Sequence, residues 1–305
     1  MRSKRRPEPG LAGRSAPLML VVLVLFQIRC DSLEMPEPGR ADRVLTATFI
    51  DVGQGDSTLF ELPGGTVILI DGGDGEHGSA AVLDLLRAKS IGTIDLLVLT
   101  HPHADHVGGL VAVLEALDVL EIWEGGAEAD TEAYRNFVQA RDSEGALVRV
   151  PDQSMIRNYG RVAIEVLNRE EGYAGENNDS LVLKISYGDT AFLMTGDVEK
   201  EETIDLLKDW GEDLDCDVLK VPHHGSASFD PAFVKATSPE LAVISVGTGN
   251  PYGQPAEETV DAYLDTGTAL CRTDLSGSIT VTTDGASLAF DCRSGSIDAG
   301  LPPAY

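Results

Sequence analysis

Short apolar runs alternate with amphipathic stretches along most of the chain. Runs rich in Val, Ile, Leu and Phe between polar or glycine-containing segments predict strands, and longer stretches with apolar residues every three or four positions predict helices. This alternation predicts an α/β domain over residues 44–292, with sheets flanked by helices. The predicted strands are residues 44–49, 57–61, 66–70, 96–99, 120–123, 161–166, 180–186, 190–194, 218–220 and 241–246, with a closing hairpin at 278–283 and 287–290. The predicted helices are residues 79–89, 108–117, 131–142, 200–210, 231–236 and 256–266.

One predicted strand runs directly into a cluster of metal-binding side chains. His101, His103, Asp105 and His106 follow strand 96–99 within six positions. Imidazole nitrogen suits zinc, and carboxylate oxygen extends the choice toward manganese and magnesium. Alternate residues of an extended turn point the same way, so we expect His101 and His103 to share one ion, with Asp105 and His106 facing a second position. A loop of ordinary surface histidines fits less well, because half of the chain's six histidines lie in this loop.

Three further strands deliver polar side chains in the same way. Asp71 follows strand 66–70 at a glycine turn, Asp197 ends the apolar run 191–196, and His223 and His224 follow strand 218–220. Two of them have a plainer alternative: Asp71 could cap a strand end, and Asp197 could cap the next helix. One such cluster is a weak signal, but four in one chain indicate a metal site.

Together these residues resemble the metallo-β-lactamase superfamily of binuclear metallohydrolases. The similarity lies in residues 68–73 as the first motif, His-x-His-x-Asp-His at 101–106 as the second, Thr195-Gly196-Asp197 as the fourth and His223-His224 as the fifth. Within the superfamily the chain is similar to the hydrolase domain of the ComEC-like DNA-uptake proteins, through residues 49–57, 177–183, 220–226 and 272–281. The resemblance extends from about residue 45 to 291. It implies a four-layer αββα sandwich with two divalent metal ions at one edge between the sheets.

The resemblance also implies roles for these side chains. The metal ligands would be His101, His103, Asp105, His106, Asp197 and His224, with Asp197 bridging the two ions. Asp105 would also accept a proton, and of the adjacent histidines His224 would be the ligand and His223 a donor to the substrate or leaving group. Asp71 and Asn178 would contact the metal ligands and not the metal itself, Asp71 by accepting a hydrogen bond from a ligand histidine.

Two departures from the superfamily pattern affect the choice of metal. The third motif usually supplies a histidine about twenty residues before Asp197, but this stretch contains Asn177, Asn178 and Asp179, as in ComEC-like members. The first position would then depend on His101, His103 and Asp197, with an asparagine oxygen or water, and would bind its ion more weakly. Conversely, many ComEC-like domains have an aspartate in place of His103. The second imidazole here favours zinc, with manganese as the alternative.

The function that follows is an exported metal-dependent hydrolase of the phosphodiesterase or nuclease type, acting through a metal-activated hydroxide. Two alternatives stay open. One is hydrolysis of a small carbonyl ester or lactone, which the missing third-motif histidine disfavours. The other is a catalytically weak binding protein on the same fold, which the intact second, fourth and fifth motifs disfavour.

The N-terminal segment and the cysteines indicate export. A basic start and about a dozen mostly apolar residues within 1–30 predict a signal peptide or a membrane or lipid anchor, with Cys30 as the acylation candidate, although Arg29 departs from the lipoprotein pattern. Residues 31–43 read as a tether and 293–305 as a tail. Cys271 and Cys292 flank the predicted closing hairpin, which makes a disulfide plausible in an oxidising compartment; two free thiols are the alternative. Cys216 is then expected to be a buried apolar residue.

The charge of the chain argues against extended DNA as a substrate. The formal net charge is −27, and since residues 1–30 hold six basic and one acidic side chain, the remainder carries −32. Such a surface repels long polyanions and leaves room for small phosphodiesters. Lys220, Lys235 and Arg272 could form a local basic patch. The segments 75–77 and 172–176 are expected to be loops at the rim of the cleft, with His77 a surface residue.

Overall fold

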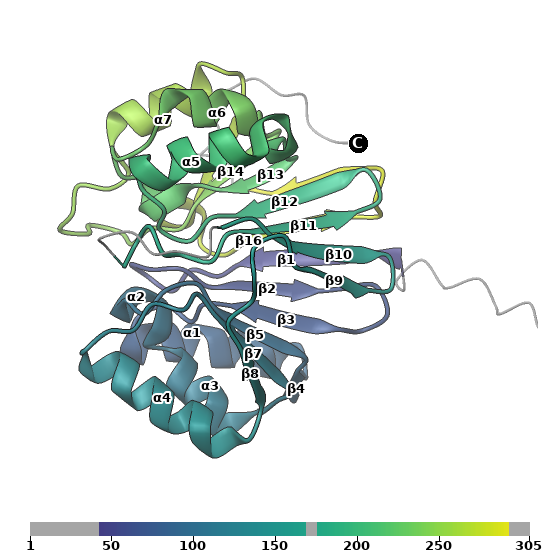
Figure 1. Ribbon diagram of the computed structural model, residues 1–305, viewed down its shortest axis with the longest axis vertical. Helices are drawn as coiled ribbons and strands as arrows, with labels where there is room; N and C mark the ends of the chain where they lie inside the picture. Colours follow the sequence, from purple (N-terminus) through teal and green to yellow (C-terminus); the bar gives the residue numbers. More distant parts are fainter. Residues whose placement is uncertain (1–42, 169–175, 293–305) are drawn as a thin grey trace, which may run out of the picture. The chain divides into compact units, whose positions relative to one another are not determined.

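The computed structural model describes residues 43–168 and 176–292, and two large β-sheets form the centre of this part of the chain (Figure 1). The first sheet has eight strands in the order β17-β16-β1-β2-β3-β5-β7-β8. Its strands are β1 (Leu45–Phe49), β2 (Thr58–Glu61), β3 (Val67–Ile70), β5 (Leu96–Leu99), β7 (Glu121–Glu124), β8 (Leu147–Arg149), β16 (Ile279–Thr283) and β17 (Leu288–Asp291).

The second sheet has seven strands in the order β15-β14-β13-β12-β11-β10-β9. Its strands are β9 (Ile156–Tyr159), β10 (Val162–Val166), β11 (Leu183–Tyr187), β12 (Thr190–Met194), β13 (Val218–Lys220), β14 (Leu241–Ile244) and β15 (Ala269–Arg272). Two short strands, β4 (Thr93–Ile94) and β6 (Asp118–Val119), pair separately.

Helices cover the outer face of each sheet, so the four-layer αββα sandwich is confirmed (Figure 1). Val82 and Leu86 share a buried cluster with Leu97 of the first sheet, and Leu206 shares another with Leu219 of the second. The helices are α1 (Gly75–Ala88), α2 (Ala104–Val107), α3 (Leu110–Ala116), α4 (Glu132–Glu144), α5 (Lys200–Trp210), α6 (Pro231–Thr237), α7 (Glu257–Leu264) and α8 (Thr273–Ser276), with 3₁₀ turns at Gly211–Leu214 and Pro222–Gly225.

The inner faces of the two sheets form the central core. Phe60 of β2 and Phe192 of β12 meet edge to face, with ring centroids 5.5 Å apart and planes at 84°, which is a favourable geometry for an aromatic pair. Buried aliphatic side chains from both sheets surround this pair. Alternation of buried and partly exposed residues in β10 and β11 shows why one face of these strands packs inward.

Most predicted elements are present within a few residues of their expected limits, and the differences have physical causes. Residues 75–77 were expected to be a loop but form the first turn of α1, because the Asp74 side chain caps that helix by accepting from the Gly78 amide at 3.1 Å. His77 is exposed, as expected. β8 and β9 were not predicted, because their residues are almost all exposed at the sheet edges and form no apolar pattern.

The direction of the strands determines where the polar strand ends meet. β3 runs parallel to β5 in the first sheet, and β12, β13 and β14 run parallel to one another in the second. The carboxyl ends of neighbouring parallel strands lie at the same edge of a sheet, where α/β proteins bind ligands. The segments after β3, β5, β12 and β13 carry the polar clusters singled out in the sequence.

The predicted signal or anchor at 1–30, the tether apart from Arg43, and the tail at 293–305 lie outside the described residues, as do residues 172–175 of the expected rim loop. None of the helices that the structure describes has both the length and the apolar character needed to cross a membrane.

A disulfide joins Cys271 and Cys292, with their Cα atoms 6.1 Å apart. Cys271 belongs to β15, an edge strand of the second sheet, and Cys292 directly follows β17, an edge strand of the first. The bond therefore connects the two sheets. Cys216 is free and buried, its thiol donates to the Thr237 carbonyl at 3.5 Å, and burial raises the pKa of that thiol.

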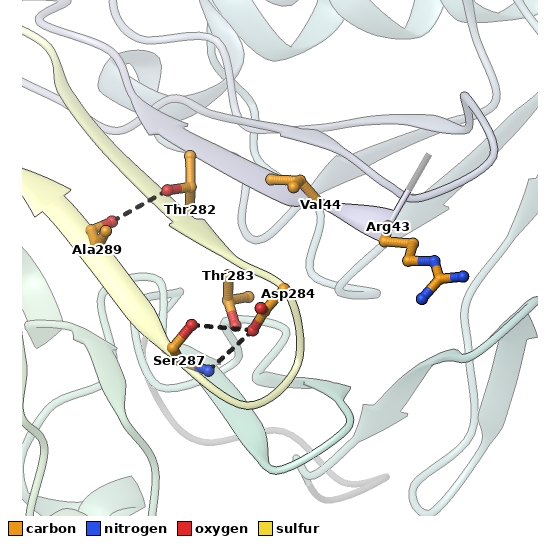
Figure 2. A pocket seen from close by; sticks show the side chains of 7 residues that line it. All are labelled: Arg43, Val44, Thr282, Thr283, Asp284, Ser287 and Ala289. Carbon is orange, nitrogen blue, oxygen red and sulfur yellow. Dashed lines mark hydrogen bonds between the residues drawn. The ribbon is translucent and has the colours of Figure 1, made fainter. Parts of the chain in front are cut away.

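A cavity of about 470 Å³ lies beside the outer end of the β1–β16 pair (Figure 2). Asp284 at its rim accepts hydrogen bonds from the Ser287 amide and hydroxyl, both at 3.0 Å. β1 starts at this cavity, and the loop after its other end leads to Asp56. The cavity is thus at the opposite end of β1 from the polar strand ends.

We expect the double substitution Cys271→Ala and Cys292→Ala to lower the free energy of unfolding by about 3 kcal/mol. The disulfide closes the loop between residues 271 and 292 and so restricts the unfolded chain. Urea denaturation with and without dithiothreitol measures the effect. Cys216→Ala is the matched control, and its unfolding midpoint should still fall in reductant. A wild-type midpoint that is insensitive to complete, mass-verified reduction would contradict the prediction.

Candidate metal centre

The loop that carries the first histidines is locked in place by its backbone. The Gly72 amide donates to the His106 carbonyl at 2.8 Å, and the Gly109 amide donates to the Gly73 carbonyl at 3.0 Å. A Cβ atom on Gly109 would lie 1.9 Å from the Gly72 carbonyl oxygen, so only glycine allows this approach. The turn after β3 and the turn after β5 therefore form one rigid unit.

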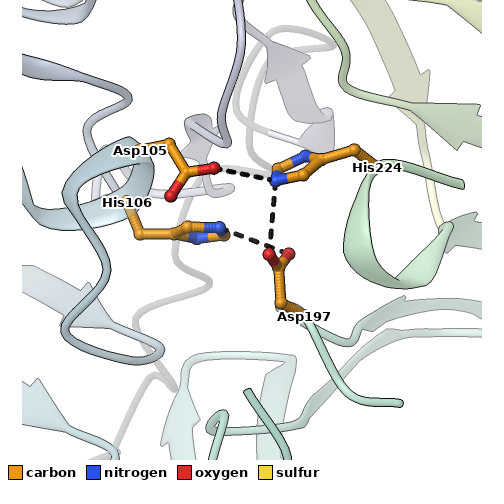
Figure 3. A group of neighbouring side chains, drawn as sticks. All are labelled: Asp105, His106, Asp197 and His224. Atoms are coloured by element: carbon orange, nitrogen blue, oxygen red, sulfur yellow. Dashed lines mark hydrogen bonds and ion pairs between the residues drawn. The ribbon is translucent and has the colours of Figure 1, made fainter. Parts of the chain in front are cut away.

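Four side chains converge at the centre of the site (Figure 3). One ligand atom from each of Asp105, His106, Asp197 and His224 lies within 4.8 Å of the other three. Asp197 is central: its Oδ1 is 3.2 Å from His106 Nε2, and its Oδ2 is 3.2 Å from His224 Nε2. Asp105 Oδ2 also lies 3.2 Å from His224 Nε2. Only Asp105 of the four is partly exposed, so the cluster has one open side.

Both central histidines are oriented by partners on their Nδ1 atoms. His106 Nδ1 lies 2.8 Å from Asp71 Oδ2, and Asp71 in turn accepts from the Thr100 amide and hydroxyl at 2.8 and 2.7 Å. His224 Nδ1 lies 2.9 Å from the Ser245 carbonyl oxygen. A donor role for both Nδ1 atoms leaves the Nε2 atoms free to bind metal. Asp71 therefore binds the backbone and side chain of Thr100 just after the end of β5 and also orients His106.

The electrostatics of the cluster fit a divalent cation. His106 Nε2 and Asp197 Oδ1 are buried and have no hydrogen bond within the described residues. Burial disfavours charge on these groups, but Asp197 and Asp71 raise the pKa of His106 well above its usual value, and Asp197 and Asp56 do the same for His224. Against the effect of burial, His224 and His106 hold the pKa of Asp197 well below its usual value. A metal ion can supply the positive charge that protons otherwise bring to this site.

The two other histidines of the loop lie beside this cluster. His101 Nε2 is 4.0 Å from Asp197 Oδ2 and 3.1 Å from His103 Nδ1. Burial and the neighbouring His106 lower the pKa of His101, which keeps it in the neutral form that binds metal. His103 is more exposed, and its Nε2 lies 2.9 Å from Glu176 Oε2. The structure brings His101, His103 and Asp197 together less closely than the central four, and it adds Glu176, which the sequence placed only at the rim.

His223 lies next to Asp197 but outside the central four. Its Nε2 is 3.9 Å from Asp197 Oδ2 and its Nδ1 is 3.3 Å from Glu199 Oε1. Both His223 and His224 have left-handed backbones, with φ of 48° and 53°, and Asp71 has φ of 57°. Non-glycine residues seldom adopt this conformation, and it is often found at functional sites. The unusual turn directs both adjacent histidines toward Asp197.

The asparagines that replace the third-motif histidine have a structural task. Asn178 Oδ1 accepts from the Glu199 amide at 2.7 Å, and Asn177 Nδ2 donates to Glu199 Oε1 at 3.0 Å. Ser180 Oγ accepts from the Asp197 amide at 3.0 Å. This segment therefore positions Asp197 and Glu199, and the Asn178 oxygen is already engaged by the backbone.

Two charged residues at the site, Asp56 and Lys220, were not among the site residues predicted from the sequence. Asp56 and Lys220 form a buried ion pair, and Lys220 Nζ is also 3.6 Å from Asp197 Oδ1. Lys220 is 1% exposed and therefore cannot contribute to a surface patch with Lys235 and Arg272, the possibility raised from the sequence; Arg272 is moreover paired with Asp274 at 2.7 Å. A lysine within the buried run Val218–Lys220 was the available signal, because lysine is almost never fully buried without a partner.

The comparisons with known proteins agree with this geometry. Residues 50–247 match the metallo-beta-lactamase superfamily, and the chain belongs to that superfamily. It is 29% identical to ComE operon protein 3 of Bacillus subtilis over 277 residues, and 32% identical to competence protein ComA of Neisseria gonorrhoeae over 234 residues. These alignments cover 85% and 76% of this chain but only 34% and 31% of the relatives, so the chain spans about a third of their length.

Solved structures give the same fold. The metallo-beta-lactamase fold protein YhfI from Bacillus subtilis superposes with a TM-score of 0.53 at 11% identity, covering 78% of this chain and 99% of that one. The similarity to ComEC-like competence proteins inferred from the motifs is confirmed.

We expect the protein to bind one divalent ion more tightly than a second, because four ligand atoms converge at one position and the ligands of the other are fewer and less closely grouped. Dialysis against increasing chelator concentrations, with zinc measured by inductively coupled plasma mass spectrometry, should show two separate releases. Simultaneous loss of both ions would contradict this asymmetry, and absence of bound metal after reconstitution would refute the metal site.

Proposed function

We propose that this chain is a metal-dependent hydrolase that cleaves phosphodiester bonds outside the cytoplasm. The observation that carries the proposal is the convergence of Asp105, His106, Asp197 and His224, in which the buried atoms His106 Nε2 and Asp197 Oδ1 have no hydrogen bond within the described residues. Two divalent ions, zinc or alternatively manganese, would supply Lewis acidity and make a water nucleophile available near neutral pH. His101 and His103 would complete the first position, with Asp197 between the two.

The residues around this centre divide the remaining tasks. Asp71 and the Ser245 carbonyl fix the orientation of His106 and His224, so that ligand nitrogens do not have to reorganise during turnover. Asp105 is on the open side of the cluster, where it can bind metal and accept a proton. His223 is 23% exposed and has Glu199 beside its other nitrogen, a position suited to donating to the substrate or leaving group.

The choice of phosphodiester is supported by the relatives. One of the relatives described above, ComA, is named a competence protein, and the ComEC-like branch that the motifs resemble takes part in DNA uptake. Because the chain spans only about a third of these relatives, we take from them the bond type and not the activity of the whole protein. The departure at the third motif, where Asn177 and Asn178 hold Glu199, disfavours the lactonase and β-lactamase alternatives.

Export is supported by the Cys271–Cys292 disulfide, because such bonds persist in oxidising compartments. The signal-like N-terminus and Cys30 as a lipid anchor belong to the same proposal. For the substrate, the net charge of −32 after residue 30 favours a small phosphodiester over extended DNA. Burial of Lys220 removes one of the three cations that could have offset this charge locally.

Asp197→Ala should reduce turnover of bis-p-nitrophenyl phosphate at least about a hundredfold and release both ions, because Asp197 lies between the two proposed positions. Zinc-reconstituted protein is assayed by absorbance, with metal content and circular dichroism measured on the same samples. Asp84→Ala, an exposed substitution on α1, is the matched control and should behave as wild type. Parallel assays with nitrocefin and a lactone decide the bond type: hydrolysis of either in place of the phosphodiester would overturn the proposed substrate class.

Ionic strength should distinguish small from large substrates. Hydrolysis of a singly charged phosphodiester should change little between about 20 and 200 mM salt, whereas any DNA cleavage should rise, because salt screens repulsion from the acidic surface. Initial rates on both substrates at constant metal concentration provide the measurement. Rapid cleavage of single-stranded DNA at low salt that weakens as salt increases would reveal a basic binding track and make a nuclease the better assignment.

A further inference from the structure

Lys220 is a buried cation at the metal centre. It is the last residue of β13, and its side chain is 1% exposed. The ammonium group contacts Asp56 Oδ2, donates to the Gly196 carbonyl at 3.0 Å and lies 3.6 Å from Asp197 Oδ1. The Lys220 carbonyl accepts from the Thr195 hydroxyl at 2.7 Å. The lysine is therefore held at both ends by the segment Thr195–Asp197.

Asp56 links this lysine to candidate ligands from both sheets. Its Oδ1 is 3.3 Å from His224 Nδ1, and its amide donates to the Asp105 carbonyl at 3.1 Å. Asp56, Asp71 and His106 also offer three atoms within 4.8 Å of one another, a grouping that could bind a cation. In this structure Lys220 already neutralises Asp56, and His106 Nδ1 is engaged by Asp71. The lysine ammonium thus takes the place of a further metal ion.

Lys220 lies among several buried carboxylates, whose negative charge it can balance. Four carboxylates, those of Asp56, Asp71, Asp105 and Asp197, lie in or against the cluster, and in the described part of the chain Lys220 is the one lysine or arginine paired with any of them. Buried carboxylates repel one another, and an unpaired buried charge is strongly destabilising. The same positive charge also repels any divalent ion that binds at Asp197.

We propose that Lys220 is a permanent internal cation that keeps the metal-free site folded and lowers its affinity for divalent metal, so that the site remains exchangeable. Lys220 is a positioning residue: it acts through Asp56 and Asp197 and does not bind metal itself. This inference depends on the metal centre of the proposed function.

The test compares Lys220→Met with Lys89→Met, a matched loss of one positive charge from an ion pair outside the site, that between Lys89 and Glu61. Zinc affinity is measured by competition with a fluorescent chelator, and thermal unfolding is recorded for the metal-free and zinc-loaded proteins. Lys220→Met should bind the tighter zinc ion about tenfold or more tightly, the effect of removing a unit charge within about 5 Å of a divalent ion even at the dielectric constant of water. Its metal-free form should unfold at a lower temperature, and zinc should restore more of that loss than in wild type.

Asp56→Asn supplies the opposite change and keeps the test decisive if metal-free Lys220→Met fails to fold. It should weaken zinc binding about tenfold, because Lys220 is then no longer balanced. The double variant Lys220→Met/Asp56→Asn should return close to the wild-type affinity. A merely structural lysine would lower stability and zinc affinity together in both single variants, and that result would overturn the inference. If wild-type protein binds neither zinc nor manganese, the proposed function fails; if it binds zinc and both variants match Lys89→Met, only the role of Lys220 fails.

Discussion

The repulsion among buried carboxylates is the constraint around which this molecule is organised. Asp56, Asp71 and Asp197 are almost completely removed from water, and Asp105 is only partly accessible. Such a cluster is tolerated only when positive charge lies among the acids. The chain meets this requirement twice, with a fixed ammonium group from Lys220 and with imidazoles that can exchange protons for metal ions. The remaining architecture places these groups within a few ångströms of one another.

The sheets provide that placement through strand direction. Parallel neighbours end at a common edge, so the residues after β3 and β5 meet each other, as do those after β12, β13 and β14. Close glycine contacts then fasten the turns together, and left-handed backbones at Asp71, His223 and His224 aim side chains inward. Such conformations cost free energy that the packed surroundings must offset. Three of the six non-glycine residues with positive φ in the described part of the chain thus lie at the charged site.

The fold and the residues of the central cluster could be predicted because both leave local signals in the sequence. Buried strands appear as apolar runs, and a metal-binding loop appears as an improbable density of histidine and aspartate. The edge strands β8 and β9 escaped because exposed strands lack an apolar pattern. The pairing of Lys220 with Asp56 escaped for a different reason. It joins residues 164 positions apart, one in the loop between β1 and β2 of the first sheet and the other at the end of β13 in the second, and no local pattern specifies which carboxylate a buried lysine will meet.

The central cluster draws Asp105 and His106 from one sheet and Asp197 and His224 from the other. A metal ion bound there would be coordinated by residues from both sheets, and the residues of neither sheet alone would offer a complete set of ligands. Metal binding would therefore depend on the two sheets being packed together, because separating them would remove two of the four ligands. A polypeptide that crosses a membrane in extended form cannot carry its ion along. If this chain travels in that way, the metal it uses is the one supplied by the compartment in which it folds.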